Sequence, residues 1–151
     1  MMTEDNLLTN LKKANKETKR GIIFCDGGSR SNPGPASGGA VLLDANKKEI
    51  ARDGIFCGVQ TNNFAEYAGL IIGLELAMKN NVSDLEVFLD SNLIVEQMNG
   101  NYKVKNTNIR PQFEKAKAIA ENFNSIKFQH VPRAKNKIAD SIVNEVLDAN
   151  A

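Results

Sequence analysis

Two aspartates in this sequence directly follow runs of apolar residues that are typical of buried strands. Asp26 follows the run GIIFC and precedes two glycines, and Asp90 follows the run LEVFL. A carboxylate at the end of a strand and beside glycine is exposed next to backbone that a ligand can approach closely. If the two strands are neighbours in a sheet, the two carboxylates lie within reach of the same metal ion. The pair therefore indicates a site for divalent cations, which prefer oxygen ligands.

Two further acids stand at the starts of predicted helices, where an acid also has a structural explanation. Glu66 lies three residues after Asn63, which is the spacing of a capping box. Asp140 lies in the first turn of the last predicted helix, where the helix dipole favours an acid. Asp90 is equally well placed to cap the helix that follows it. Capping accounts for each acid singly, but it does not account for four acids that occur together with their neighbouring motifs in this order.

The elements that would position these acids are predicted from hydrophobic periodicity and turn residues. The predicted order is three strands, a helix, a strand, two helices, a strand and a last helix: Gly21–Cys25, Ala40–Leu43, Glu49–Cys57, Phe64–Lys79, Leu85–Leu89, Asn92–Met98, Pro111–Phe123, Ser125–Val131 and Ile138–Leu147. A meander of three strands, followed by strands that alternate with helices, predicts an α/β fold in which helices flank a mixed sheet.

The length of 151 residues fits one compact domain, with a change of composition near Arg20. Residues 1–20 are polar and rich in lysine, so we expect a tail or a short, loosely docked helix there, followed by a folded domain over residues 21–151 that contains the four acids. No apolar run approaches the roughly 18 residues of a membrane span, and the N-terminus has no apolar stretch of a signal peptide. We therefore expect a cytoplasmic protein without membrane contacts.

The net charge of +1 conceals two basic stretches. Residues 101–117 carry five basic residues and one acid, and residues 127–137 carry four basic residues and no acid, so each stretch totals +4. A polyanion could bind such stretches, although solvated lysines on helix faces explain the charge equally well. With one histidine and two cysteines, the chain cannot complete a Cys/His zinc site.

Four motifs around the acids resemble those of type 1 ribonucleases H, in the compact form found in archaea and many bacteria. The resemblance covers about residues 21–148, and the motifs read CDGGSRSNPGPASGGA around Asp26, TNNFAEY around Glu66, FLDSNLIVEQMNG around Asp90 and HVPRAKNKIAD ending at Asp140. It implies a ribonuclease H-like fold with a five-stranded mixed sheet of order 3-2-1-4-5. It also implies an endonuclease that cuts the RNA strand of RNA/DNA hybrids and leaves 5′-phosphate and 3′-hydroxyl ends.

By the same resemblance, Asp26, Glu66, Asp90 and Asp140 are the catalytic residues and bind two divalent metal ions. Mg²⁺ is the expected ion, and Mn²⁺ could substitute for it. Four carboxylates held close together would repel one another and take up protons unless cations neutralised them. Metals about 4 Å apart activate the attacking water and stabilise the leaving 3′ oxygen. We expect Asp26 and Asp90 to bridge the ions, with Glu66 at the water-side metal and Asp140 at the other.

An enzyme that cuts RNA opposite DNA must recognise the 2′-hydroxyl groups of RNA. The resemblance implies substrate contacts from the following residues: Gly27, Gly28, Asn32, Asn62, Asn63, Ser91, Arg133 and Asn136. Asparagine suits this role because its amide has a donor and an acceptor end. A turn before the following proline is the alternative for Asn32, and helix capping is the alternative for Asn62 and Asn63. The expected partner is an RNA/DNA hybrid, double-stranded RNA remains open, and the protein is expected to be a monomer.

The sequence departs from well-studied bacterial members of the family at two places. Residues 101–108 replace a long basic helix, so we expect weaker affinity for the hybrid, with Tyr102, Lys103 and Lys105 as candidate backbone contacts. A short loop replaces the flexible loop that carries a histidine, and His130 is expected to be structural or a peripheral polar contact. Arg133 in the short loop is the candidate for contacting a substrate phosphate or for assisting product release.

Three other functions compete with this interpretation. A proofreading exonuclease, or a phosphatase with an aspartyl nucleophile, requires a second acid two residues after the first, and Gly28 occupies that position. A catalytically inactive module that only binds hybrids or double-stranded RNA would be signalled by the loss of one of the four acids. All four are present.

Overall fold

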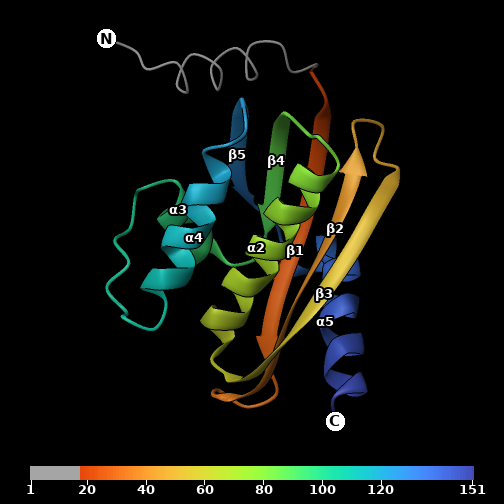
Figure 1. The fold of residues 1–151 in the computed structure, drawn as a ribbon. Coiled ribbons are helices and arrows are strands. Elements are labelled where there is room, and N and C mark those ends of the chain that lie inside the picture. The colour runs from red at the N-terminus through yellow and green to blue at the C-terminus, as the bar shows by residue number, and fades with distance from the viewer. Residues whose placement is uncertain (1–17) are drawn as a thin grey trace.

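The computed structural model describes residues 18–151 as a mixed sheet with helices on both of its faces (Figure 1). Its strands are β1 (Arg20–Ser29), β2 (Gly34–Asp44), β3 (Glu49–Gln60), β4 (Asp84–Leu89) and β5 (Ser125–His130). Its helices are α2 (Asn62–Lys79), α3 (Asn92–Met98), α4 (Arg110–Ala120) and α5 (Lys137–Ala149), with a short 3-10 turn, η1 (Arg133–Lys135), before α5. Within the described residues, no helix is long and apolar enough to cross a membrane. The prediction for residues 1–20 lies outside the described residues, apart from the last three of them.

The strand order is β3-β2-β1-β4-β5, which confirms the order that the family resemblance implied. The first three strands pair in antiparallel fashion, whereas β4 is parallel to both β1 and β5. Along β4, the alternating residues Leu85, Val87 and Leu89 are buried, which confirms the predicted period of two. Parallel pairing of β1 with β4 is the feature that matters for function, because it brings the ends of these two strands to the same place.

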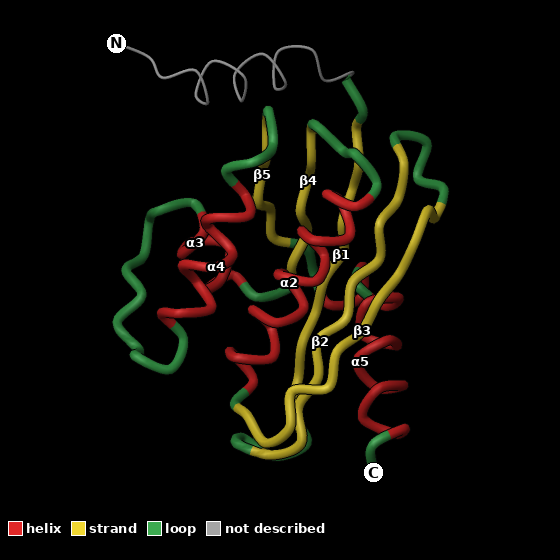
Figure 2. Tube along the Cα trace, in the orientation of Figure 1, coloured by secondary structure: helices red, strands yellow, loops and turns green. Residues whose placement is uncertain are grey.

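Helices α2, α3 and α4 cover one face of the sheet and α5 covers the other (Figures 1 and 2). Two adjacent glycines in β2 mark this arrangement, since the space beside Gly38 is taken by α2 and the space beside Gly39 is taken by α5. Between the sheet and α4, helix α2 is buried through most of its length. In this core the hydroxyl of Tyr67 donates a hydrogen bond of 2.6 Å to Oε1 of Gln97, so the one polar group of a fully buried ring has a partner.

The first two strands are longer than the sequence predicted. β1 continues through Asp26 to Ser29, and β2 begins at Gly34 rather than at Ala40. Glycine and serine are poor strand formers and conceal the apolar pattern, but here their backbones pair across the ladder, as in Gly28 with Ser37. The prediction that Asp26 ends the first strand was therefore wrong. Asp26 lies inside β1, at the point where the pairing with β4 stops and the pairing with β2 continues.

Candidate active site

The register of β1 and β4 places Asp26 and Asp90 side by side. Cys25 pairs with Leu89 as the last pair of the parallel ladder, and each aspartate is the next residue along the chain. Asp26 remains fixed by its pairing with Gly39 in β2, whereas Asp90 has already left the sheet. One carboxylate is thus held by a strand and the other by the turn that follows a strand.

Glu66 reaches this place because α2 packs unusually close to β1. The Cα of Gly69 lies so near the carbonyl of Asp26 that an added Cβ would overlap its oxygen. A Cβ on Gly27 would likewise overlap the backbone of Ala65. Since neither glycine has a side chain to separate the two elements, Glu66 lies next to Asp26 at the edge of the sheet.

Residues other than the acids cap the helices. The hydroxyl of Thr61 accepts a hydrogen bond of 3.2 Å from the amide of Phe64, so Thr61 is the N-cap of α2. The hydroxyl of Ser91 accepts from the amide of Ile94 and caps α3. The capping-box explanation of Glu66 and the capping explanation of Asp90 are therefore not realised.

Asp26, Glu66 and Asp90 form a compact group of carboxylates. Each offers one oxygen, and these oxygens all lie within 4.8 Å of one another. Burial, the charges of Asp90 and Asp140 and a hydrogen bond with Asp140 raise the pKa of Asp26 to about 7, against the opposing effect of a hydrogen bond from the amide of Gly27. Burial, followed by the charges of Asp26 and Asp90, raises the pKa of Glu66 to about 8, although the hydroxyl of Ser91 opposes this shift. Both shifts show that the negative charges of these carboxylates are not neutralised by nearby positive groups. A bound divalent cation would neutralise them.

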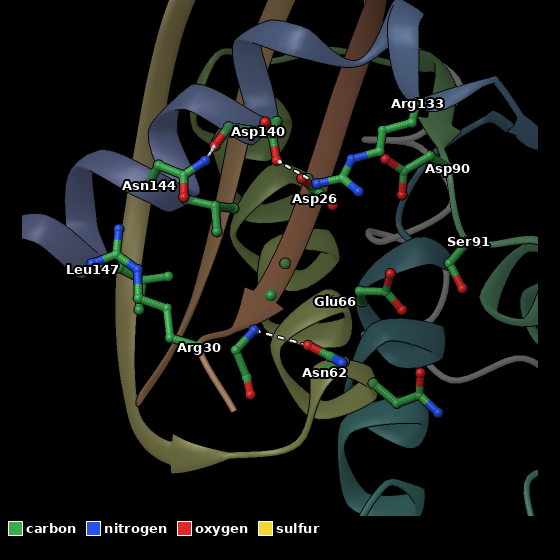
Figure 3. A pocket seen from close by; sticks show the side chains of 15 residues that line it. Asp26, Arg30, Asn62, Glu66, Asp90, Ser91, Arg133, Asp140, Asn144 and Leu147 are labelled. Atoms are coloured by element: carbon green, nitrogen blue, oxygen red, sulfur yellow. Dashed lines mark hydrogen bonds and ion pairs between the residues drawn. The ribbon is translucent and has the colours of Figure 1, made fainter. Parts of the chain in front are cut away.

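Asp140 stands at the rim of this group, in the first turn of α5. Its carboxylate helps to raise the pKa of Asp26, so the fourth acid is electrostatically coupled to the other three. Its Oδ1 lies 3.9 Å from Nη2 of Arg133, and Figure 3 shows the arginine extending from η1 across the mouth of the cleft. The structure therefore brings all four predicted acids to one cleft, with three in tight contact and the fourth beside them.

The predicted asparagines hold two loops together near the acids. Oδ1 of Asn62 accepts a hydrogen bond of 2.9 Å from the amide of Ser29, and the amide of Asn62 donates to Oδ1 of Asn32 at 3.0 Å. Asn62 and Asn63 line the cleft of about 530 Å³ that contains the acids, whereas Asn32 is not among its lining residues. The peptide bond between Asn32 and Pro33 is cis. Asn32 thus connects the loop after β1 to the start of α2.

Asn136 is a buried support for β1 rather than part of the cleft wall. Its side chain is 1% exposed, and its Nδ2 donates a hydrogen bond of 2.9 Å to the carbonyl of Cys25, the residue before Asp26. In the described part of the chain, its Oδ1 is the buried side-chain atom left without a hydrogen-bond partner. We therefore interpret Asn136 as a positioning residue that ties the start of α5 to the strand that carries Asp26, and its burial argues against the predicted substrate contact.

Replacing Asn136 by alanine is expected to lower the free energy of unfolding by about 1–3 kcal/mol, because it removes a buried hydrogen bond and leaves the Cys25 carbonyl short of a donor. Urea unfolding measures the change. Asn122→Ala is the matched control, since Asn122 also donates from its side chain to backbone carbonyls but does so in solvent. Equal losses of stability in the two variants would contradict the supporting role of Asn136.

The cleft also has walls that the sequence did not predict. Arg30 from the loop after β1 lines it, as do Val143, Asn144 and Leu147 of α5. Asn144 follows Asp140 by four residues and therefore shares its helix face, which is a signal that the sequence contained. His130 ends β5 and donates from Nε2 to the backbone carbonyl of Asp90 at 3.2 Å. Its position agrees with the structural role expected for it.

Comparison with known proteins places this geometry in a family. A family model described as reverse transcriptase-like matches residues 24–146. The N-terminal RNase H domain of Rv2228c from Mycobacterium tuberculosis has a TM-score of 0.85 and 43% identity, covering 87% of this chain and 96% of that domain. RNase H1 of Halobacterium salinarum has a TM-score of 0.83 and 38% identity, covering 86% of this chain and 98% of that structure.

A third similar structure is that of LC11-RNase H1, which was solved in complex with an RNA/DNA hybrid. Its TM-score is 0.81 at 41% identity, and the match covers 86% of this chain and 98% of that one. Full-length curated relatives are longer than the matched region. The chain spans 36% of the length of the bifunctional protein Rv2228c and 63% of the length of the halobacterial ribonuclease HI.

Proposed function

This chain belongs to the type 1 ribonuclease H family, and we propose that it hydrolyses the RNA strand of RNA/DNA hybrids, leaving 5′-phosphate and 3′-hydroxyl ends. The observation that carries the proposal is the group of three carboxylates, Asp26, Glu66 and Asp90, whose oxygens lie within 4.8 Å of one another in an open cleft. The hybrid bound in the similar LC11 structure supports the substrate class.

The donor set suits two Mg²⁺ ions held by Asp26, Glu66, Asp90 and Asp140, and Mn²⁺ accepts the same oxygen ligands. Bound there, divalent cations activate a water for attack on phosphorus and stabilise the leaving 3′ oxygen. The carboxylates are partly buried, and their raised pKa values of about 7 for Asp26 and about 8 for Glu66 mean that a cation competes with protons for them near neutral pH. A cation therefore binds more tightly as the pH rises toward 8.

The residues around the acids are suited to orient the RNA strand. Gly27 and Gly28 line the cleft together with Asn62 and Asn63, whose amides offer both donors and acceptors. Ser91 lines the same cleft, and its hydroxyl partly offsets the raised pKa of Glu66. These groups recognise sugar and backbone rather than base edges, so cleavage should depend little on sequence.

A second groove supports contact with the rest of the hybrid. It is lined by Tyr102, Lys103, Lys105 and Arg110, and the ring of Tyr102 is 51% exposed. Lysine and arginine at such a groove bind phosphates, and an exposed aromatic ring packs against sugars or bases. We propose that the DNA strand binds in this groove. We also propose that the protein acts as a cytoplasmic monomer.

The test uses a hybrid labelled on its RNA strand, incubated with the protein in Mg²⁺, Mn²⁺ or EDTA beside matched DNA and RNA duplexes. We expect cleavage of the hybrid RNA with either metal and none in EDTA, and end analysis should find 5′-phosphates. A Glu66→Gln protein purified in parallel reports any nuclease carried over from the expression host. Cleavage of the RNA duplex would extend the substrate range to double-stranded RNA. Binding of the hybrid without cleavage under every metal would replace the proposal with an inactive binding module.

A further inference from the structure

The cleft that contains the acids continues along α5 beyond Asp140. Its further wall is formed by residues at helical spacing on α5 and by one residue from the loop after β1: Val143, Asn144, Leu147 and Arg30. From Asp140 to Asp148 the helix advances eight residues, which corresponds to about 12 Å. The cleft is therefore longer than the acid cluster requires, and its far part needs another explanation.

An ion pair with Asp148 holds Arg30 at the far end. Nη2 of Arg30 donates to Oδ1 of Asp148, and the arginine side chain runs beside Leu147 on α5 (Figure 3). The guanidinium has five N–H donors in a planar fork, and the side chain is 40% exposed. Asp148 thus fixes the position of the group while leaving donors for a second anion.

The distribution of charge along the cleft matches a chain of phosphates. Among the residues that line it, Arg30 and Arg133 are the basic ones, and they pair with acids at different points of α5, Asp148 and Asp140. Arg133 is near the acids, at 3.9 Å from Asp140, whereas Arg30 lies two turns of α5 away. A strand that passes over the acids and continues along α5 would meet a cation on each side of the site of cleavage.

We propose that Arg30 binds a phosphate of the RNA strand several nucleotides from the one that is cut, and that Asp148 positions its guanidinium for this contact. The contact belongs to the RNA strand because the cleft that holds Arg30 is the one that holds the acids. A strand that lies along α5 spans about 12 Å with a few nucleotides. Arginine suits the role since its fork binds a phosphate through two parallel hydrogen bonds. The inference rests on the proposed function and adds a positioning contact to it.

The experiment compares wild type, Arg30→Ala and Arg30→Gln in steady-state cleavage of a short hybrid with Mg²⁺. We expect KM to rise roughly tenfold in both variants, with kcat changed less than twofold. The slope of log affinity against log salt should fall by about one. Hybrids with a single neutral methylphosphonate, placed at successive positions of the RNA strand, then locate the contact. At one position, the methylphosphonate should raise the KM of the wild type by the same factor as the Arg30→Ala substitution does. The same methylphosphonate should not raise the KM of Arg30→Ala any further.

Arg52→Ala is the matched control, because Arg52 forms a similar exposed ion pair with Glu49 on β3, away from the cleft. Thermal unfolding confirms that each variant is folded, and Arg30→Gln retains a long side chain should the alanine variant fail to fold. A KM for the Arg30 variants equal to that of Arg52→Ala would overturn the inference, as would equal losses at every methylphosphonate position. Those results would leave hybrid cleavage itself intact, whereas a wild type that neither binds nor cuts the hybrid would remove the proposed function and this contact together.

Discussion

Replacing Glu66 by glutamine is expected to abolish cleavage while making the metal-free protein more stable at alkaline pH. The loss of activity should be roughly a thousandfold or more, because a metal-binding carboxylate supports several kcal/mol of transition-state stabilisation and each 1.36 kcal/mol is a factor of ten. The gain in stability comes from the same position, since Glu66 is partly buried beside Asp26 and Asp90 and both repel its charge.

The pH window follows from the raised pKa. The pKa of Glu66 is about 8 in the folded protein against 4.5 for the ordinary side chain, so between these values the folded state holds a proton that the unfolded chain has released. The contribution of Glu66 to the free energy of unfolding is therefore fully present below pH 4.5 and is lost as the pH rises through 8. Glutamine is neutral throughout and does not lose this contribution. At pH 8.5 the variant should exceed the wild type by a free energy on the order of a few kcal/mol.

Urea unfolding in EDTA at pH 6.0 and 8.5, repeated in Mg²⁺, measures both effects. Added Mg²⁺ should stabilise the wild type more than the variant, because a ligand stabilises the state that binds it, and the gain increases with the logarithm of its affinity. Glu86→Gln serves as the control, since Glu86 is an exposed residue of β4 outside the cleft. If wild type and Glu66→Gln unfold at the same urea concentration in EDTA at pH 8.5, the carboxylates do not repel one another as described.

The candidate site was largely predictable because its acids lie in sequence motifs that can be recognised without knowledge of how the chain packs. Asp26 and Asp90 follow apolar runs, and parallel pairing of those runs is enough to bring them together. The sequence could not decide between capping and catalysis for Glu66 and Asp90, since both roles use the same residue at the same place. The structure excludes the capping roles, because Thr61 and Ser91 cap the helices instead, and the catalytic roles stay predictions.

Packing details were the part that the sequence could not predict. The resemblance implied a substrate contact for Asn136, but its side chain is buried and hydrogen bonds to the carbonyl of Cys25 in β1. Arg30 carried no pattern of its own, and its place in the cleft depends on Asp148, which lies 118 residues away in the chain. Contacts between residues so far apart in the chain form only in the folded protein, and they produce no periodic pattern in the local sequence.

Replacing Gly69 by alanine is expected to destabilise the protein by about 3 kcal/mol or more, although alanine is the better helix former by about 1 kcal/mol. Gly69 lies within α2, so helix propensity alone predicts a gain. The added methyl group, however, would overlap the carbonyl oxygen of Asp26, and backbone cannot move aside as a flexible side chain can. The melting temperature should fall by roughly 10 °C, and cleavage should decline because Glu66 can no longer lie beside Asp26.

The sign of this change separates two explanations of the site. If local propensity governs α2, Gly69→Ala raises the melting temperature, whereas if close contact with β1 governs it, the melting temperature falls. Gly28→Ala is the control in β1, since a Cβ there would lie 3.7 Å from Cγ1 of Val143, an ordinary contact, and the fold should tolerate it. Gly28→Ala should instead impair cleavage with the fold intact, because its backbone faces the cleft. A stable Gly69→Ala with full activity would show that the glycine contact does not position the acids.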